Sequence, residues 1–171
     1  MKVKTGTQPT KQEWARAYAL QALSDLRARE VLVKAGTEKC HRLHYLQMAA
    51  EKTCKAHLTS ANGHDSVRKT HAYVQTVLPT IARHFYSTNE ESKLQGWQLE
   101  QIKRLAREIE VIAPACDAGD VREDNSEYPW LDSQGRVETP CRYKFPNIDD
   151  GDKGIVHLIK VIRSAAEVYA R

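Results

Sequence analysis

The sequence predicts an all-α protein, an antiparallel bundle of four to five helices with a long crossover between the last two. Apolar residues recur at three- and four-residue intervals in five segments, which is the period of a helix with one buried face. Helix-breaking and capping residues stand at the ends of most of these segments. Residues 115–152 lose the helical period. We therefore expect a single domain over 1–171, with a flexible N-terminus at 1–10.

The first two helices are predicted over 11–35 and 38–59. Gly36 is a natural C-terminal stop for the first helix, and Thr37 is a candidate N-cap for the second. The second segment is apolar nearly all round its circumference, which is typical of a central, largely buried helix.

Three further helices are predicted over 71–86, 94–113 and 153–170. Thr70 can cap the helix over 71–86, and Pro79 inside it should cause a kink or mark a start. The last two segments keep the helical period for more than four turns. Between them, Tyr128–Leu131 and Arg136–Glu138 flank a turn signal and could pair as a small β-hairpin.

Composition places the chain among globular proteins outside the membrane. Of 171 residues, 41% are hydrophobic and 28% are charged, and the net charge of +4 permits nucleic-acid binding without requiring it. No apolar run approaches the roughly 18 residues of a membrane span. The first residues carry no apolar signal-peptide core. We therefore expect a cytoplasmic protein with no membrane association.

The four cysteines form no Cys-x-x-Cys pair, so we expect reduced thiols. A metal site is suggested by Cys40, His41, His44, Cys54 and His57. However, Cys40 and Cys54 would lie about 21 Å apart along one helix at ~1.5 Å per residue, too far for one zinc ion. Cys54 is better interpreted as a packed apolar residue, and we expect neither a metal nor a cofactor.

Two groups of residues could bind nucleic acid. Arg68 and His71 stand in a basic stretch before the third helix, where they could contact phosphates with His71 as an acid or base, or form a solvated turn. In the crossover, aromatic side chains beside arginine could stack nucleobases or could cover the end of the bundle. These crossover candidates are Arg122, Tyr128, Arg142 and Tyr143, with Trp130 as the residue that pins the loop to the core.

Residues 44–58, HYLQMAAEKTCKAHL, resemble the signature helix of the HEPN superfamily. Three shorter elements resemble the same family: Asp25–Arg29 at the end of the first helix, Thr70-His71, and Arg142-Tyr143. The resemblance implies a helical bundle that dimerises and cleaves or binds RNA. It also implies a place in a toxin–antitoxin or antiphage system, with a nucleotidyltransferase or another defence-system protein as partner.

The sequence departs from the family's nuclease pattern. Family nucleases carry Arg followed, after four to six residues, by His, and no histidine in this chain has arginine at that spacing. The candidates for a variant catalytic site are His71, Arg68 and Arg142. Cleavage without a metal would need a general base and a general acid near the 2′-hydroxyl of RNA.

Three hypotheses about function follow from these patterns. The first is a non-catalytic HEPN-like dimeric domain with a binding or regulatory role in a defence module. The second is a divergent HEPN ribonuclease. The third is a generic helical interaction module whose likeness to the family comes from packing alone.

Charge is distributed unevenly along the chain. Residues 1–60 contain 11 basic and 5 acidic residues, whereas 115–153 contain 5 basic and 10 acidic residues. An acidic crossover would repel phosphate, so any nucleic-acid surface should lie on the first two helices. We also expect the crossover to pair with the helices through opposite charges.

Overall fold

The computed structural model describes residues 8–67, 73–87, 95–114 and 122–171. Within these ranges the chain forms five α-helices, one 3-10 turn and one two-stranded antiparallel hairpin, which confirms the predicted all-α bundle with its small hairpin. The elements are α1 (Lys11–Lys34), α2 (Lys39–Asn62), η1 (His64–Ser66), α3 (Val74–Ser87), α4 (Gly96–Val111), β1 (Trp130–Leu131), β2 (Val137–Glu138) and α5 (Lys153–Tyr169).

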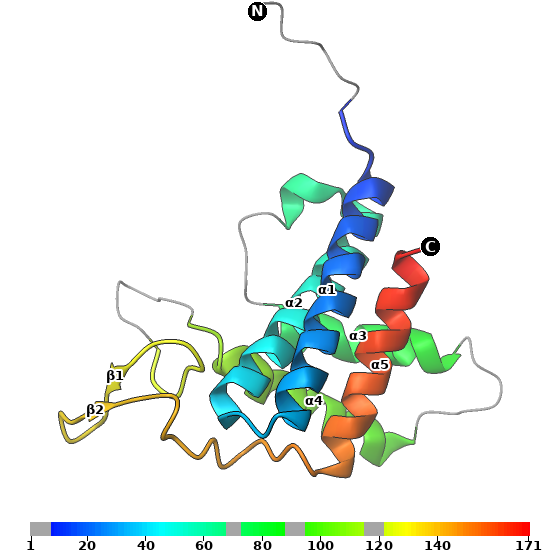
Figure 1. The fold of residues 1–171 in the computed structure, drawn as a ribbon. Coiled ribbons are helices and arrows are strands. Elements are labelled where there is room, and N and C mark those ends of the chain that lie inside the picture. The colour runs from blue at the N-terminus through cyan, green and yellow to red at the C-terminus, as the bar shows by residue number, and fades with distance from the viewer. Residues whose placement is uncertain (1–7, 68–72, 88–94, 115–121) are drawn as a thin grey trace, which may run out of the picture.

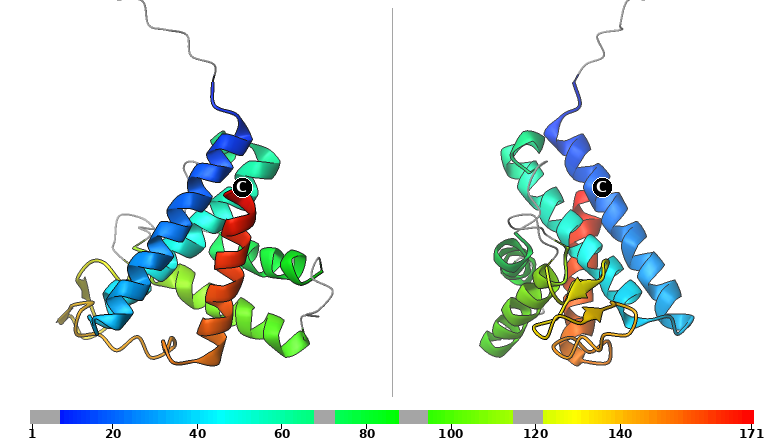
Figure 2. Two further views of the ribbon diagram at one scale, coloured as in Figure 1. Left: turned by 45° about the vertical axis from the view of Figure 1, so that its right-hand side comes forward. Right: turned by 90° about the vertical axis from the view of Figure 1, so that its left-hand side faces the viewer.

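The helices form two groups (Figure 1). Helices α1 and α2 make a long antiparallel hairpin, and α5 runs beside α1 in the opposite direction. Helices α3 and α4 form an antiparallel pair that crosses this group. The hairpin β1–β2 and the described residues around it, 122–152, lie at the end of the bundle where α1 meets α2 (Figure 2).

Local hydrogen bonds define the ends of α1 and α2. Thr10, predicted to belong to a flexible N-terminus, is the N-cap of α1 and forms a capping box with Glu13. The prediction of Thr37 as the cap of α2 is wrong, because Glu38 holds that position and the Thr37 hydroxyl donates back to the Leu32 carbonyl. Gly63 ends α2 with φ of 90°, a conformation that glycine adopts without strain.

Helix α3 begins at Val74, three residues later than predicted. Tyr73 supplies the first carbonyl acceptor, and the Glu110 carboxylate of α4 accepts from the Gln75 amide at 3.0 Å. An acidic side chain from another helix therefore satisfies a helix-start amide, a role that the sequence assigned to Thr70. Thr70 itself lies outside the described residues. Pro79 stands inside the helix and neither begins nor ends it.

Helix α2 is the central element, as predicted from its apolar circumference. Leu43, Leu46 and Cys54 are buried against apolar side chains of the other helices. The same helix also buries Gln47, Glu51 and Lys55. Gln47 donates to Glu51 at 3.0 Å and Lys55 pairs with Glu51 at 2.8 Å, so these polar groups are satisfied inside the fold.

A second polar contact joins α1 to α2. Lys52 reaches the buried Asp25 carboxylate at 2.6 Å, and Gln21 donates to the same carboxylate at 3.0 Å. Asp25, Gln47, Glu51 and Lys52 are also the residues that carry the resemblance of the first two helices to the HEPN family. In this fold Asp25 and Lys52 join α1 to α2, whereas Gln47 and Glu51 pair within α2.

Asp150 anchors the crossover to the first two helices. Its carboxylate pairs with the guanidinium groups of Arg29 from α1 and Arg42 from α2, the latter at 2.7 Å. Nearby, Lys39 donates to the carbonyls of Lys144 and Phe145 at 3.0 and 2.9 Å. The predicted charge pairing between the acidic crossover and the basic helices is thus confirmed within one chain.

Trp130 and Asn125 fix the part of the crossover around the hairpin β1–β2. Trp130 is 6% exposed and packs edge-on against Tyr143, as predicted for the residue that pins this loop. The Asn125 side chain is fully buried, donating to two backbone carbonyls and accepting from the amides of Glu127 and Tyr128. This side chain therefore forms the hydrogen bonds with backbone groups of the loop that regular secondary structure would otherwise provide.

We predict that Asp150→Asn destabilises the protein by about 2–4 kcal/mol, because it leaves two largely buried guanidinium groups without a counter-charge. Glu30→Gln breaks the exposed pair between Glu30 and Arg163 and should change the stability by less than about 1 kcal/mol. Urea unfolding of both variants measures the difference, and equal effects would contradict the anchoring role of Asp150.

Stability should decrease on acidification. Burial lowers the pKa of His57, with a further contribution from the positive charge of His84, and burial together with Lys160 lowers the pKa of His157. The unfolded chain, with ordinary histidine pKa values of about 6.5, therefore binds more protons than the native state below that pH. The free energy of unfolding should fall between about pH 7.5 and about pH 5.5.

Urea unfolding at the two pH values tests this dependence. His57→Gln and His157→Gln should each reduce the loss of stability at low pH. His41→Gln provides the control, because the His41 side chain is 58% exposed. If the loss of stability at low pH is the same in all variants, titratable groups other than His57 and His157 cause it.

Candidate functional site

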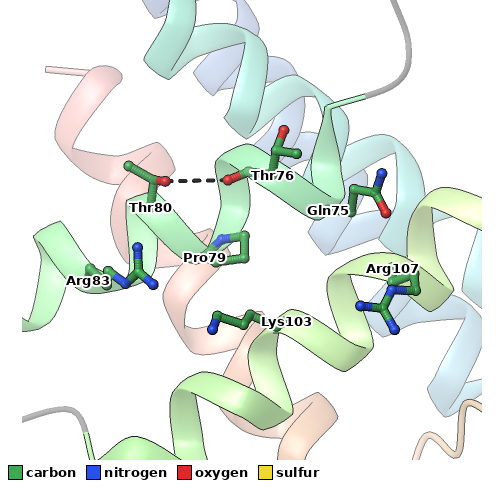
Figure 3. A pocket seen from close by; sticks show the side chains of 7 residues that line it. All are labelled: Gln75, Thr76, Pro79, Thr80, Arg83, Lys103 and Arg107. Atoms are coloured by element: carbon green, nitrogen blue, oxygen red, sulfur yellow. Dashed lines mark hydrogen bonds between the residues drawn. The ribbon is translucent and has the colours of Figure 1, made fainter.

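An open groove lies between α3 and α4, with a volume of about 390 Å³. Figure 3 shows three basic side chains around it, Arg83 from α3 and Lys103 and Arg107 from α4, with Lys103 between the two arginines in this view. Polar groups of α3 complete the lining. These are Gln75, Thr76 and Thr80, and Pro79 forms the floor between them.

Helical spacing puts these residues on one side of each helix. Thr76, Thr80 and Arg83 follow one another at intervals of four and three residues, and Lys103 and Arg107 are four residues apart. The core residues of the two helices, among them Leu78, Ala82 and Leu105, point the other way. The groove is therefore the outer seam of a helix pair whose inner side is packed against α2 and α5.

Positive charge in the groove is largely uncompensated. Arg83 and Arg107 are exposed, and neither has an ion-pair partner within the described ranges. Lys103 is half-buried and pairs with the exposed Glu100 at 2.7 Å, a contact that an incoming anion could replace. Two guanidinium groups and one ammonium group form a donor set that suits phosphate oxygens, whereas the hydroxyls of Thr76 and Thr80 donate to backbone carbonyls three and four residues before them.

The basic residues of α1 and α2, by contrast, are mostly engaged inside the molecule. Arg29, Arg42, Lys52 and Lys55 pair with carboxylates, and Lys39 donates to backbone carbonyls. Although residues 1–60 carry a net positive charge, most of their cationic side chains are therefore not available to bind a ligand at the surface. This arrangement argues against the nucleic-acid surface that the sequence placed on the first two helices.

Arg122 is close to the end of α4 and interacts with it. Its guanidinium donates to the carbonyl of Glu110 at 2.9 Å and approaches that of Val111 at 3.4 Å. Cationic side chains stabilise helix C-termini in this way, because the last carbonyls lack helical partners. Arg122 thus has a clear structural role, and its predicted part in ligand binding stays a prediction.

The other crossover candidates are spread over different environments. Tyr143 is half-buried between Trp130 and Phe145, and burial together with Asp124 raises the pKa of its phenol to about 12. Tyr128 is 54% exposed, and Arg142 is exposed. These side chains do not line the α3–α4 groove, and binding by Tyr128 or Arg142 stays a prediction.

Arg68 and His71 lie outside the described residues. Two of the histidines suggested as metal ligands have other partners. Nδ1 of His44 lies 3.1 Å from a carboxylate oxygen of Glu127, and His57 forms a hydrogen bond with the Tyr169 hydroxyl. Cys40 and Cys54 are buried thiols, and burial raises the pKa of both. No group of three His, Cys, Asp or Glu side chains that could hold a metal ion occurs in the part of the chain described by the structure.

No family model, curated protein or solved structure matches this chain. The interpretation of the groove consequently depends on its own geometry and chemistry. Among the described helices, none combines the length and the apolar character that a transmembrane helix needs.

The α3–α4 groove was not predicted from the sequence, although a signal for it exists. Residues 61–114 have a net charge of only +1, which conceals the clustering of cations on one side of two helices. The four-residue spacing of Lys103 and Arg107 indicates a common face. Arg83 joins them only because α3 packs antiparallel to α4, which the sequence pattern did not specify.

We predict that Arg122→Ala lowers the free energy of unfolding by about 1 kcal/mol, because the last carbonyls of α4 lose their donor. Arg142→Ala should change it by less than about 0.5 kcal/mol, since this side chain is exposed. Chemical denaturation compares the two, and a larger effect of Arg142→Ala would contradict the structural role assigned to Arg122.

Proposed function

We propose that this chain is a non-catalytic HEPN-like domain that binds RNA through phosphate groups along the α3–α4 groove. The observation that carries the proposal is the convergence of Arg83, Lys103 and Arg107 on one open groove, with both arginines unpaired within the described ranges. Contacts with phosphates dominate the affinity of nucleic-acid-binding proteins.

RNA, rather than DNA, is proposed because of the resemblance of 44–58 to the HEPN signature helix. The lack of the family's Arg–His spacing supports binding without cleavage. A homodimer and a partner such as a nucleotidyltransferase belong to the same proposal, on the same resemblance. A role in a toxin–antitoxin or antiphage module would combine RNA binding with such a partner.

Binding of a fluorescently labelled single-stranded RNA of about 20 nucleotides tests the proposal. Three phosphate contacts predict that the affinity falls with salt with a logarithmic slope of about −2. The double variant Arg83→Glu, Arg107→Glu should bind at least about tenfold more weakly and with a shallower slope. Fluorescence anisotropy at about 50 mM and about 200 mM salt measures both quantities.

The double variant Arg27→Glu, Lys34→Glu is the matched control. It makes the same change of charge at two exposed positions of α1 and should bind RNA nearly as well as the parent protein. Equal binding by parent and groove variant, or a greater loss in the α1 variant, would contradict the proposed surface. Shortening of the RNA during the assay, abolished by Arg142→Ala, would favour the divergent ribonuclease instead.

A further inference from the structure

A second cavity lies on the opposite side of α3 from the groove, where α3 meets α2 and α5. It has a volume of about 300 Å³, at the lower end of the range typical of small-molecule sites. Ile81 and Phe85 of α3 and Ala165 and Val168 of α5 make most of its lining apolar. Val168 is 57% exposed, so the cavity is open to solvent beside this residue.

Three polar side chains, from three helices, line the same cavity. His57 comes from α2, His84 from α3 and Tyr169 from α5. Nδ1 of His57 lies 2.7 Å from the Tyr169 hydroxyl, which fixes the imidazole and leaves Nε2 as its other ring nitrogen. A few positioned polar groups within an apolar lining are typical of ligand sites.

The polar groups of the cavity suit a ligand that carries an anionic acceptor. His84 acts electrostatically on His57 and helps to lower its pKa, so the two imidazoles are close enough to repel when both are protonated. None of the described residues lining the cavity carries a carboxylate. A ligand carboxylate would relieve this repulsion and accept hydrogen bonds from imidazole N–H groups.

We propose that this cavity binds a small aromatic carboxylate, with its ring between Phe85 and Val168 and its carboxylate toward His57 and His84. Phe85 offers a ring face or edge to an aromatic ligand, and the apolar lining removes the ligand ring from water. The site shares no residue with the α3–α4 groove, and the proposal does not depend on RNA binding.

2-Naphthoate is a suitable probe, and 2-naphthamide is its uncharged analogue of the same size. A ligand of about 13 non-hydrogen atoms at ordinary efficiency should bind with a Kd on the order of 1 mM or tighter. Naphthamide should bind at least about fivefold more weakly, because charged acceptors make stronger hydrogen bonds. Ligand-observed NMR titrations of the full chain measure both affinities.

Variants at exposed positions localise the binding. Val168→Trp should fill the cavity and abolish naphthoate binding, whereas Val156→Trp, at a valine of α5 that is 61% exposed and outside the cavity lining, should leave it unchanged. His84→Phe keeps a ring but removes the imidazole donor, and it should reduce the preference for naphthoate over naphthamide. Arg107→Glu, in the groove but on α4 and outside the cavity lining, should retain naphthoate binding, which separates this site from the groove.

Three results would overturn the proposal. The first is no saturable binding up to about ten times the expected Kd. The second is naphthoate binding that survives Val168→Trp, or that Val156→Trp weakens equally. The third is an unchanged preference for the carboxylate in His84→Phe.

Discussion

Asp150 receives the guanidinium groups of Arg29 and Arg42 where the crossover passes the end of the α1–α2 hairpin. Two cations left there without a counter-charge would be strongly unfavourable, so the crossover must return to this place before α5 begins. The contact fixes the start of α5 only a few residues later.

Charged side chains are also paired inside the fold along the seam between α1 and α2. A central helix that is buried nearly all round carries Glu51, Lys52 and Lys55, and each of these has a partner within the fold. Pairing leaves few cations available on the first two helices, although that segment holds most of the excess positive charge. Available positive charge remains at the α3–α4 pair, where the exposed Arg83 and Arg107 have no ion-pair partner among the described residues.

Helix α3 contributes to both surfaces to which we assign ligands. Thr76, Thr80 and Arg83 face the groove with α4, whereas Ile81, His84 and Phe85 face the cavity with α2 and α5. A helix that crosses the main bundle has two flanks, and each forms a concave seam with a different neighbour. One seam is cationic and open, and the other is apolar with two imidazoles, so the two suit different ligands.

The sequence by itself determined the helices, the hairpin and the burial of α2, because apolar periodicity and turn residues act over a few neighbouring positions. It also indicated that the acidic crossover would pair with the basic helices. Only the tertiary structure decided which charges remain available. Arg83 and Arg107 line one groove, and His57 and His84 line one cavity, through the packing of neighbouring helices at angles that apolar periodicity does not specify. The Gln75 amide at the start of α3 is likewise satisfied through tertiary packing, since the carboxylate of Glu110 comes from another helix.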